Sequence, residues 1–315
     1  MDFTIKPLLP GMHFAGEVIG IDVASPINSS VYDQLRNALG KYAVLVFRNQ
    51  NINDDQQIAF SEKFGSLEKS LGFDRGGGVT HPEISRIANV DDNNKIRSHG
   101  DEKSRYHRGN SLWHSDSSFK PIPANISILS GREVPPFGGE TEFADARYAY
   151  DTWPGSISGV EKKDLEGLIC EHSIIFSRQL IVGDIFSDED KERLKPVRQA
   201  LIRRHPETGR KVFYLGSHCH FVEGWDYSKS RALITELTSW MTRPEFVYAH
   251  KWAPLDLVMW DNRSVLHRGN PWPDEEYRRI MHRTTVAGDQ PTCLLYTSDA
   301  ADDMQCVDLG GRRII

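Results

Sequence analysis

The chain has 315 residues, of which 39% are hydrophobic and 26% charged, as is ordinary for a globular protein of one large domain or two small ones. Its net charge of −6 indicates no nucleic-acid partner, and no apolar run is long enough to span a membrane. The N-terminus lacks a signal-peptide pattern, and the four cysteines are scattered without metal-binding spacing. These features favour a cytoplasmic protein with reduced cysteines.

The first part of the chain combines helical and strand-like patterns. Apolar residues at helical spacing predict a helix over residues 31–41, with the serines at 29–30 available to cap it. The apolar run at 42–47 is short enough to be a buried strand. A second helix is expected over 56–64, capped by the polar residues at 53–55.

Residues 72–109 are polar and loop-like, apart from a strand-like segment at 84–90. They lie directly before the segment that is the best candidate for metal binding. A long loop in this position is often a lid, and a plain insertion is the alternative. The sequence leaves both interpretations open.

The rest of the chain consists mostly of short strands separated by turn residues. Strand patterns occur at 124–129, 140–144, 211–215, 256–260 and 278–286, and helical patterns at 145–153 and 228–241. No internal repeat is visible in the sequence. Many short strands with helices outside them predict a mainly β protein with a jelly-roll-like barrel rather than alternating strand–helix units.

The segment 112–119 (LWHSDSSF) places His114 and Asp116 two residues apart. On a strand, residues i and i+2 point to the same side, so the two side chains would face one point. A metal needs a third ligand, and His267 is the best candidate. Two histidines and one carboxylate form the ligand set of non-haem Fe(II) oxygenases. A His-x-Asp triplet alone more often marks a surface turn, so this assignment depends on the rest of the chain.

A strand-like segment at 278–286 carries several basic residues downstream of the third candidate ligand. One face of this strand would present Arg279 and Arg283, whereas Arg278 would lie on the other. A guanidinium is a planar fork that suits a carboxylate, and a buried guanidinium needs such a partner. An exposed basic strand is the alternative interpretation.

Several separated motifs together resemble the taurine dioxygenase/2,4-dichlorophenoxyacetate dioxygenase family of Fe(II)- and 2-oxoglutarate-dependent oxygenases. The motifs are VLVFR with DQQIAF, LWHSDSSF, GGETEF, WDNRSVLHRG and RIMHRT, between about residue 5 and about residue 290. The phenoxyacetate branch is more similar than the taurine branch. The resemblance implies a mainly β fold with flanking helices around a double-stranded β-helix (jelly-roll, clavaminate synthase-like) core, in a single domain over residues 1–293.

The resemblance implies that His114, Asp116 and His267 are the metal ligands and catalytic residues. The cofactor would be Fe(II), with 2-oxoglutarate and O2 as co-substrates. Related halogenases lack the carboxylate ligand so that chloride can bind. The presence of Asp116 therefore indicates hydroxylation.

The resemblance also implies that Thr141 and Arg279 hold the distal carboxylate of 2-oxoglutarate. Arg283 would lie near the other carboxylate or near an anionic group of the substrate. The spacing from His267 to Arg279 is one residue longer than in the family pattern. An extra loop residue accounts for this difference, or Arg278 binds the carboxylate instead; the four-residue step to Arg283 favours the first explanation.

Asn110 matches a family position that lines the substrate pocket, and His218 aligns with a family histidine, so both are expected to bind substrate together with Arg283. The leading expectation is a dioxygenase that hydroxylates a small anionic molecule, with a phenoxyacetate-like ether as first choice. A taurine, alkylsulfonate or alkylsulfate dioxygenase is an alternative within the family. A non-catalytic metal- or ligand-binding jelly roll and a metal-dependent hydrolase are alternatives from other classes. The resemblance also allows a homo-oligomer.

Residues 294–315 fall outside the family pattern and show no usable periodicity. They resemble the translation of a sequencing adapter read through at the end of a contig. We therefore expect a poorly packed, artefactual tail. A tag or a genuinely divergent tail is the alternative.

Overall fold

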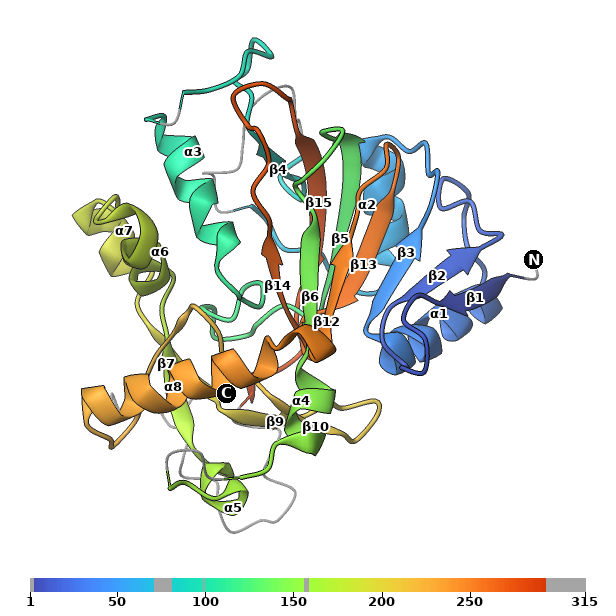
Figure 1. Ribbon diagram of the computed structural model, residues 1–315. Helices are drawn as coiled ribbons and strands as arrows, with labels where there is room; N and C mark the ends of the chain where they lie inside the picture. The colour runs from blue at the N-terminus through green and yellow to red at the C-terminus, as the bar shows by residue number, and fades with distance from the viewer. Residues whose placement is uncertain (1–2, 71–80, 99, 156–158, 293–315) are drawn as a thin grey trace.

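The computed structural model describes residues 3–70, 81–98, 100–155 and 159–292. Short strands form its centre and helices lie around them, so the fold is mainly β with flanking helices, as predicted (Figure 1). Within these described ranges no helix is both long enough and apolar enough to cross a membrane. The tail expected at 294–315 lies outside the described residues.

Seven strands form the largest sheet, in the order β1-β2-β3-β13-β5-β15-β4 (Figure 1). They are β1 (Thr4–Pro7), β2 (Gly16–Ile19), β3 (Val44–Phe47), β13 (Leu257–Asp261), β5 (Ile126–Glu133), β15 (Ile280–Val286) and β4 (Ser85–Ala88). Neighbouring strands are antiparallel, except that β2 and β3 are parallel. Because β5 lies between β13 and β15, the middle and the end of the chain meet at the centre of this sheet.

A smaller sheet packs on one face of the large one. Its order is β12-β6-β14, with β12 (Val247–His250), β6 (Thr141–Asp145) and β14 (Val265–Gly269), all antiparallel. A shared buried cluster lies between the two sheets and includes Phe143, Tyr248 and Val265 from the small sheet and Val44, Val46, Val258, Trp260 and Met281 from the large one. The two sheets therefore form two β layers around one apolar core.

Two helices cover the opposite face of the large sheet. Helices α1 (Ser29–Tyr42) and α2 (Asp54–Glu62) share a second buried cluster with Leu45 and Phe47 of β3. Successive strand residues face opposite sides, so the valines of β3 face the small sheet while Leu45 and Phe47 face the helices. Burial on both faces explains why this strand is apolar throughout.

Helix α1 begins at a cap that differs from the expectation. The side chain of Asn28 accepts a hydrogen bond from the backbone N–H of Val31 at 2.9 Å, so the prediction that a serine at 29–30 caps the helix was wrong. An asparagine outside the helix is placed to accept such a bond, whereas the serines already belong to the first turn. In α2, Asn53 and Gln56 form a capping box, as the polar segment at 53–55 predicts.

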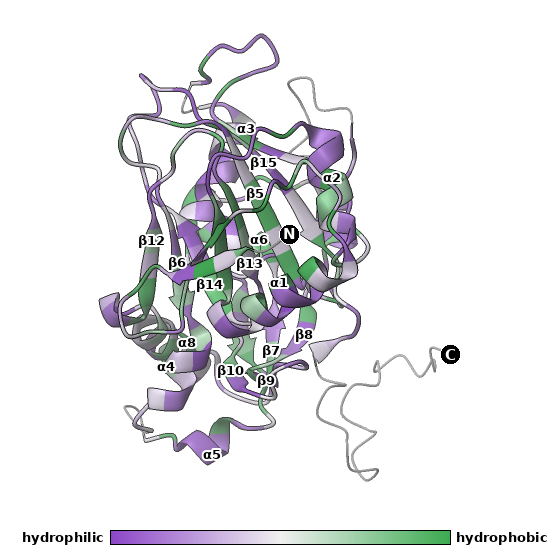
Figure 2. Cartoon of the chain, turned by 90° about the vertical axis from the view of Figure 1, so that its right-hand side faces the viewer, coloured by the Kyte–Doolittle hydropathy of each residue, from purple (hydrophilic) through white to green (hydrophobic). Residues whose placement is uncertain are grey.

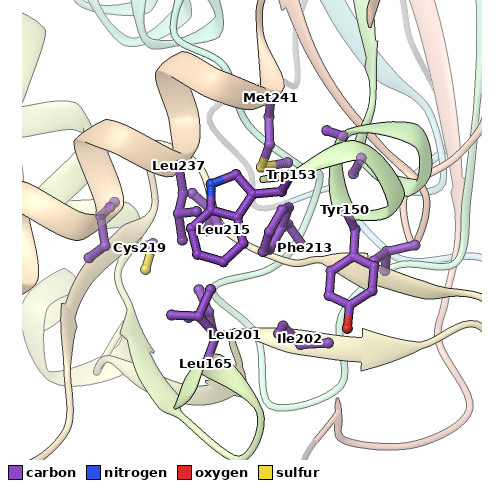
Figure 3. Close-up of a cluster of buried hydrophobic side chains, with 14 of the residues drawn as sticks. Tyr150, Trp153, Leu165, Leu201, Ile202, Phe213, Leu215, Cys219, Leu237 and Met241 are labelled. Carbon is purple, nitrogen blue, oxygen red and sulfur yellow. The ribbon is translucent and has the colours of Figure 1, made fainter. Parts of the chain in front are cut away.

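The chain between β6 and β12 builds a third buried cluster beside the sheets (Figure 3). Trp153, Phe213, Leu237 and Met241 are among the side chains that converge in it. The elements of this region are α4 (Ala146–Thr152), α5 (Lys162–Leu165), β7 (Ile169–His172), α6 (Ile174–Val182), α7 (Asp188–Arg193), β8 (Val197–Ala200), β9 (Ile202–Arg204), β10 (Lys211–Phe213), β11 (Cys219–Val222), α8 (Tyr227–Met241) and η2 (Pro244–Phe246). Figure 2 shows that α5, at the periphery, is largely hydrophilic, whereas β5 and β13 are apolar.

Part of the segment that the sequence predicts to be a loop is helical. Strand β4 confirms the strand expected at 84–90, but α3 (Glu102–His107) and η1 (Arg108–Ser111) stand where a loop is predicted. Helix α3 is short and mostly polar, so its sequence carries no apolar period. Residues 72–80 and 99, which belong to the proposed lid, lie outside the described residues. Strands β12 and β14 are likewise not predicted, and in β14 polar residues follow the first two apolar positions.

Candidate metal and co-substrate site

Backbone pairing brings His114 and His267 together. The N–H of each residue donates to the carbonyl of the other, at 3.0 and 2.8 Å. His267 lies on β14, but His114 forms only this isolated bridge before the chain turns at residues 116–119. The expectation that His114 and Asp116 lie on one strand was therefore wrong, because Asp116 already begins the turn. The two imidazole rings nevertheless lie with their centroids 4.2 Å apart.

Asp116 completes a buried group of three potential metal ligands. Its Oδ1 lies 3.8 Å from Nε2 of His114, and its Oδ2 lies 3.6 Å from Nε2 of His267. One ligand atom from each of the three residues falls within 4.8 Å of the others. The structure thus brings together all three residues that the sequence suggests as ligands.

Both histidines are held in the form that binds metals. The Nδ1–H of His114 donates to the carbonyl of Leu112 at 2.7 Å, which leaves the lone pair on Nε2 facing Asp116. Burial lowers the pKa of His114, and it lowers the pKa of His267 well below the usual value. Neutral imidazole is the metal-binding form of histidine. Neither side chain therefore has to lose a proton at neutral pH.

The carboxylate of Asp116 is held ionised. Burial alone would raise its pKa, but the charge of Arg283 and the hydrogen bond from Ser127 hold the pKa well below its usual range. Nη1 of Arg283 donates to Oδ1 at 2.6 Å, and the hydroxyl of Ser127 donates to Oδ2 at 2.7 Å. Two neutral imidazoles and one ionised carboxylate fit the ligand set of a non-haem Fe(II) centre.

Asn262 holds the ligand loop against β13. Its Oδ1 accepts hydrogen bonds from the backbone N–H of Asp116 at 3.2 Å and from the indole N–H of Trp260 at 3.0 Å. Its side-chain amide donates to the Ser127 hydroxyl at 2.9 Å, and the Ser115 hydroxyl donates to the backbone carbonyl of Asn262 at 2.7 Å. Such partners fix the orientation of a ligand. No sequence motif marks these supporting roles, because they arise from pairing between distant segments.

The structure distinguishes the two adjacent arginines. Arg278 is 36% exposed and forms an ion pair with Glu133 at 3.0 Å. Arg279 is buried, and its guanidinium donates to the carbonyl of Gly139 at 3.3 Å and lies over the Trp272 ring. Burial lowers the pKa of Arg279 to about 10. Its Nε has no hydrogen-bond partner among the described residues.

Arg279 and Thr141 are joined by the glycine loop before β6. A Cβ atom at Gly139, where φ is +68°, would lie 3.3 Å from Nε of Arg279, so the glycine allows the guanidinium a close approach. Thr141 begins β6 two residues later, and its hydroxyl accepts a hydrogen bond from the indole N–H of Trp252 at 3.0 Å. A buried arginine with an unused Nε–H, and a fixed hydroxyl two residues from the glycine that the arginine approaches, are groups suited to a carboxylate.

A cavity opens beside the three candidate ligands. Five of the site residues expected from the sequence line this cavity: His114, Asp116, Arg283, Asn110 and His218. The other three, Thr141, Arg279 and His267, are not among its described lining residues. Lining residues that the sequence analysis does not identify include Ile87, Tyr106, Phe119, Ile174 and Arg178. No sequence motif marks these positions as pocket residues. They line one cavity only because the elements that carry them converge there.

His218 forms part of the cavity wall as a neutral side chain. Its ring centroid lies 5.9 Å from that of His114 and 5.0 Å from that of Phe119. Its Nδ1 lies 2.8 Å from the hydroxyl of Ser177 on α6. Burial lowers the pKa of His218 well below its usual value. At neutral pH it therefore offers polar contacts without a charge.

His205, Glu207 and Asp261 form a second group whose potential ligand atoms lie close enough to hold a metal ion. The negative charges of this group are already balanced by an arginine. Arg263 donates to Asp261 at 2.6 Å and to Glu207 at 2.9 Å. His205 lies 2.8 Å from Asp261. This group is an internal ion-pair network that ties the end of β13 to the turn after β9.

Comparisons with known proteins agree with this geometry. The family model described as "Taurine catabolism dioxygenase TauD, TfdA family" matches residues 4–285. The alpha-ketoglutarate-dependent 2,4-dichlorophenoxyacetate dioxygenase of Cupriavidus pinatubonensis is 39% identical, over 92% of this chain and 99% of its own. The (S)-phenoxypropionate/alpha-ketoglutarate-dioxygenase of Sphingobium herbicidovorans is 34% identical, over 91% of this chain and 96% of its own.

A solved structure is also similar over nearly the whole chain. The crystal structure of AAD-2 in complex with Mn(II) and N-oxalylglycine is 40% identical, has a TM-score of 0.83, and covers 93% of this chain and 99% of that one. The fold and the three-residue group define a metal-dependent oxygenase scaffold. The chain belongs to the TauD, TfdA family of dioxygenases.

Proposed function

We propose that this chain is an Fe(II)- and 2-oxoglutarate-dependent dioxygenase that hydroxylates a small anionic organic molecule. The observation that carries this proposal is the buried group of His114, Asp116 and His267 at the edge of a cavity. The names of two relatives specify phenoxyacetate and phenoxypropionate substrates. We therefore place an aryloxy acid ahead of a sulfonate or a sulfate.

In this proposal His114, Asp116 and His267 bind Fe(II) through two imidazole nitrogens and one carboxylate oxygen. When bound, Fe(II) supplies the activation of O2 that oxidises 2-oxoglutarate and hydroxylates the substrate. The three protein ligands leave further coordination positions for 2-oxoglutarate and O2. Because the pKa values of the histidines are lowered by burial, metal binding displaces no proton from them at neutral pH.

We assign the distal carboxylate of 2-oxoglutarate to Arg279 and Thr141. The buried position of Arg279 and its unused Nε support this role over that of Arg278, which already pairs with Glu133. Arg283 contacts Asp116 and so lies beside the metal ligands. In this proposal its charge would lie near the other carboxylate of the co-substrate or near an anionic group of the substrate.

The cavity residues Asn110 and His218 would contact the organic substrate. Hydroxylation of the carbon between an ether oxygen and a carboxylate gives a hemiacetal, which collapses to a phenol and glyoxylate. The balanced reaction consumes one aryloxyacetate, one 2-oxoglutarate and one O2, and gives one phenol, one glyoxylate, one succinate and one CO2. Release of a phenol therefore distinguishes this substrate class from a sulfonate or a sulfate.

The fold supports the same assignment. We infer that the two packed sheets form the double-stranded β-helix of the family and that residues 1–293 constitute one domain. The apolar core shared by both sheets and the family match over residues 4–285 support this inference.

The test is succinate formation by purified, Fe(II)-loaded protein with 2-oxoglutarate and a panel of phenoxyacetates, sulfonates and sulfates. We expect succinate and phenol in equal amounts with a phenoxyacetate, and neither product without O2. Turnover that needs no O2 would indicate a hydrolase instead. Failure to bind Fe(II) or 2-oxoglutarate would refute the oxygenase proposal.

A further inference from the structure

Arg178 is a buried cation that the proposed chemistry leaves without a role. It lies on α6, where it is 4% exposed, and it lines the cavity together with His114 and Asp116. Its guanidinium stacks over the ring of Tyr106, with Cζ 4.6 Å from the ring centroid. Its side chain is thus fixed at the wall of the substrate cavity by packing.

The hydrogen bonds of Arg178 are largely unsatisfied. Nη2 donates to the side-chain oxygen of Asn110 at 3.1 Å, which is a neutral partner. Nε and Nη1 are buried and have no hydrogen-bond partner within the described part of the chain. No carboxylate of the described residues forms an ion pair with Arg178. A buried charge without a counter-ion is costly, so this arrangement favours binding of an anion.

Two of the three other cations among the described lining residues already have counter-ions, and the third, Lys69, is exposed to solvent. Arg283 pairs with Asp116 at 2.6 Å, and Lys120 pairs with Glu68 at 2.6 Å. An incoming carboxylate would have to compete with these protein carboxylates. At Arg178 it would meet no such competitor, and the amide of Asn110 lies next to the guanidinium.

A glycine creates the space that Arg178 occupies. A Cβ atom added at Gly109 would overlap Nη1, Cζ and Cδ of Arg178. Gly109 lies in η1, the short 3-10 helix that leads to the metal-ligand segment. The structure therefore accommodates the guanidinium at a specific point between α6 and η1.

Apolar side chains share the cavity with this cation. Ile87, Phe119 and Ile174 line it beside Arg178 and Tyr106. A mainly polar cavity that also has an apolar part of its wall and a buried guanidinium without a counter-ion fits an amphipathic acid, with an aryl body and one carboxylate. We propose that Arg178 binds the carboxylate of such an aryloxyalkanoic acid and so selects anionic over neutral substrates. This inference rests on the proposed function and names its substrate-anchoring residue.

The test measures binding of phenoxyacetate and of neutral phenoxyacetamide to the full chain, with Fe(II) and 2-oxoglutarate under nitrogen. For Arg178→Gln we expect the Kd of phenoxyacetate to rise about 10- to 100-fold, because a charged hydrogen bond is lost. The Kd values of phenoxyacetamide and 2-oxoglutarate should change less than about twofold. Arg178→Lys, which keeps the charge but loses the planar fork, should restore part of the affinity.

Two further variants separate binding from folding. Arg231→Gln is the matched control, because Arg231 donates to the backbone carbonyls of Cys219 and His220 and is not among the described cavity-lining residues. The phenoxyacetate affinity of this variant should equal that of the wild type. Gly109→Ala keeps Arg178 but displaces it, and should weaken phenoxyacetate binding more than phenoxyacetamide binding.

Three results would overturn the inference. One is an unchanged phenoxyacetate Kd in Arg178→Gln, and another is an equal loss of acid, amide and 2-oxoglutarate binding. The third is equal affinity of the wild type for phenoxyacetamide and phenoxyacetate. This result does not depend on the folding of any variant. By contrast, a wild type that binds neither Fe(II) nor 2-oxoglutarate refutes the proposed function itself, so the two failures are distinguishable.

Discussion

The indole N–H of Trp252 donates a hydrogen bond to the hydroxyl oxygen of Thr141 at 3.0 Å. Because that oxygen accepts from the indole, the hydroxyl proton of Thr141 stays available for a ligand. The same ring lies against His250, with centroids 4.6 Å apart, so its position is fixed by packing. Thr141 is thus oriented as a donor before any carboxylate arrives.

Trp252→Phe should weaken 2-oxoglutarate binding while the aromatic ring is kept. Loss of one neutral hydrogen bond costs about 0.5–1.5 kcal/mol, which corresponds to a Kd about 2- to 12-fold higher. Calorimetry with 2-oxoglutarate and Mn(II) measures this change. Trp240→Phe, which loses an indole hydrogen bond to the carbonyl of Ala149 instead, is the control and should leave the Kd unchanged.

Substitutions of the adjacent arginines 278 and 279 should differ sharply in their effect on the Kd of 2-oxoglutarate. Arg279→Gln removes a buried guanidinium and is expected to raise the Kd of 2-oxoglutarate about 10- to 100-fold. Arg278→Gln removes a partly exposed ion pair with Glu133, which contributes at most about 1 kcal/mol to stability. If Arg278→Gln proved the more damaging change, the assignment of the carboxylate to Arg279 would be wrong.

Removal of one candidate ligand should abolish metal binding without unfolding the protein. His114→Ala is expected to lower Fe(II) affinity more than about 100-fold. Loss of a residue that only hydrogen-bonds to a metal ligand typically lowers the affinity about 10- to 100-fold, and loss of the ligand itself should cost more. The fold should persist because the backbone pairing of His114 with His267 does not need the imidazole. His220→Ala changes a half-buried histidine paired with Glu171 and should keep wild-type affinity. Metal retention by His114→Ala would contradict the ligand assignment.

Ser127 should tune the metal site indirectly. Its hydroxyl donates to Oδ2 of Asp116, and Ser127→Ala is expected to lower metal affinity about 10-fold or more by freeing that carboxylate. Ser130→Ala is the control, because this other buried serine of β5 forms no hydrogen bond with Asp116 in the described part of the chain. Equal metal affinities for the two variants would show that the hydrogen bond from Ser127 has no influence on Asp116.

His250 should make stability depend on pH. Burial lowers the pKa of His250, although its contact with Asp256 at 3.1 Å opposes this effect. In the unfolded chain the imidazole has a pKa of about 6.5. There is therefore a pH range below about 6.5 in which the imidazole is protonated in the unfolded chain and still neutral in the native protein. Unfolding is thus favoured as the pH falls below about 6.5, by at most about 1.4 kcal/mol per pH unit for this one group.

The measurement is urea unfolding of the wild type and His250→Gln between pH 8 and pH 5. Other buried histidines affect both proteins equally, so the stability advantage of the wild type should shrink as the pH falls. A constant difference across this range would show that His250 does not contribute to the pH dependence.

Local patterns predicted many elements because they record which faces are buried. The apolar run of β3 and the helical spacing of α1 each reflect contacts with neighbouring layers, and both were confirmed. Helix α3 and strand β14 were missed, because polar and functional residues replace the apolar period there. Hydrogen bonding and burial between distant segments, which no local pattern records, decide such elements.

The sequence by itself determined the chemical groups of the candidate site. His114, Asp116 and His267 are the right residue types in recognisable motifs, and the structure places them together. Only the tertiary structure decided that Arg279 is buried while Arg278 pairs with Glu133, and that Arg178 faces the same cavity as the ligands. The physical reason is that burial and charge compensation depend on partners far apart in the chain, and folding alone brings those partners into contact.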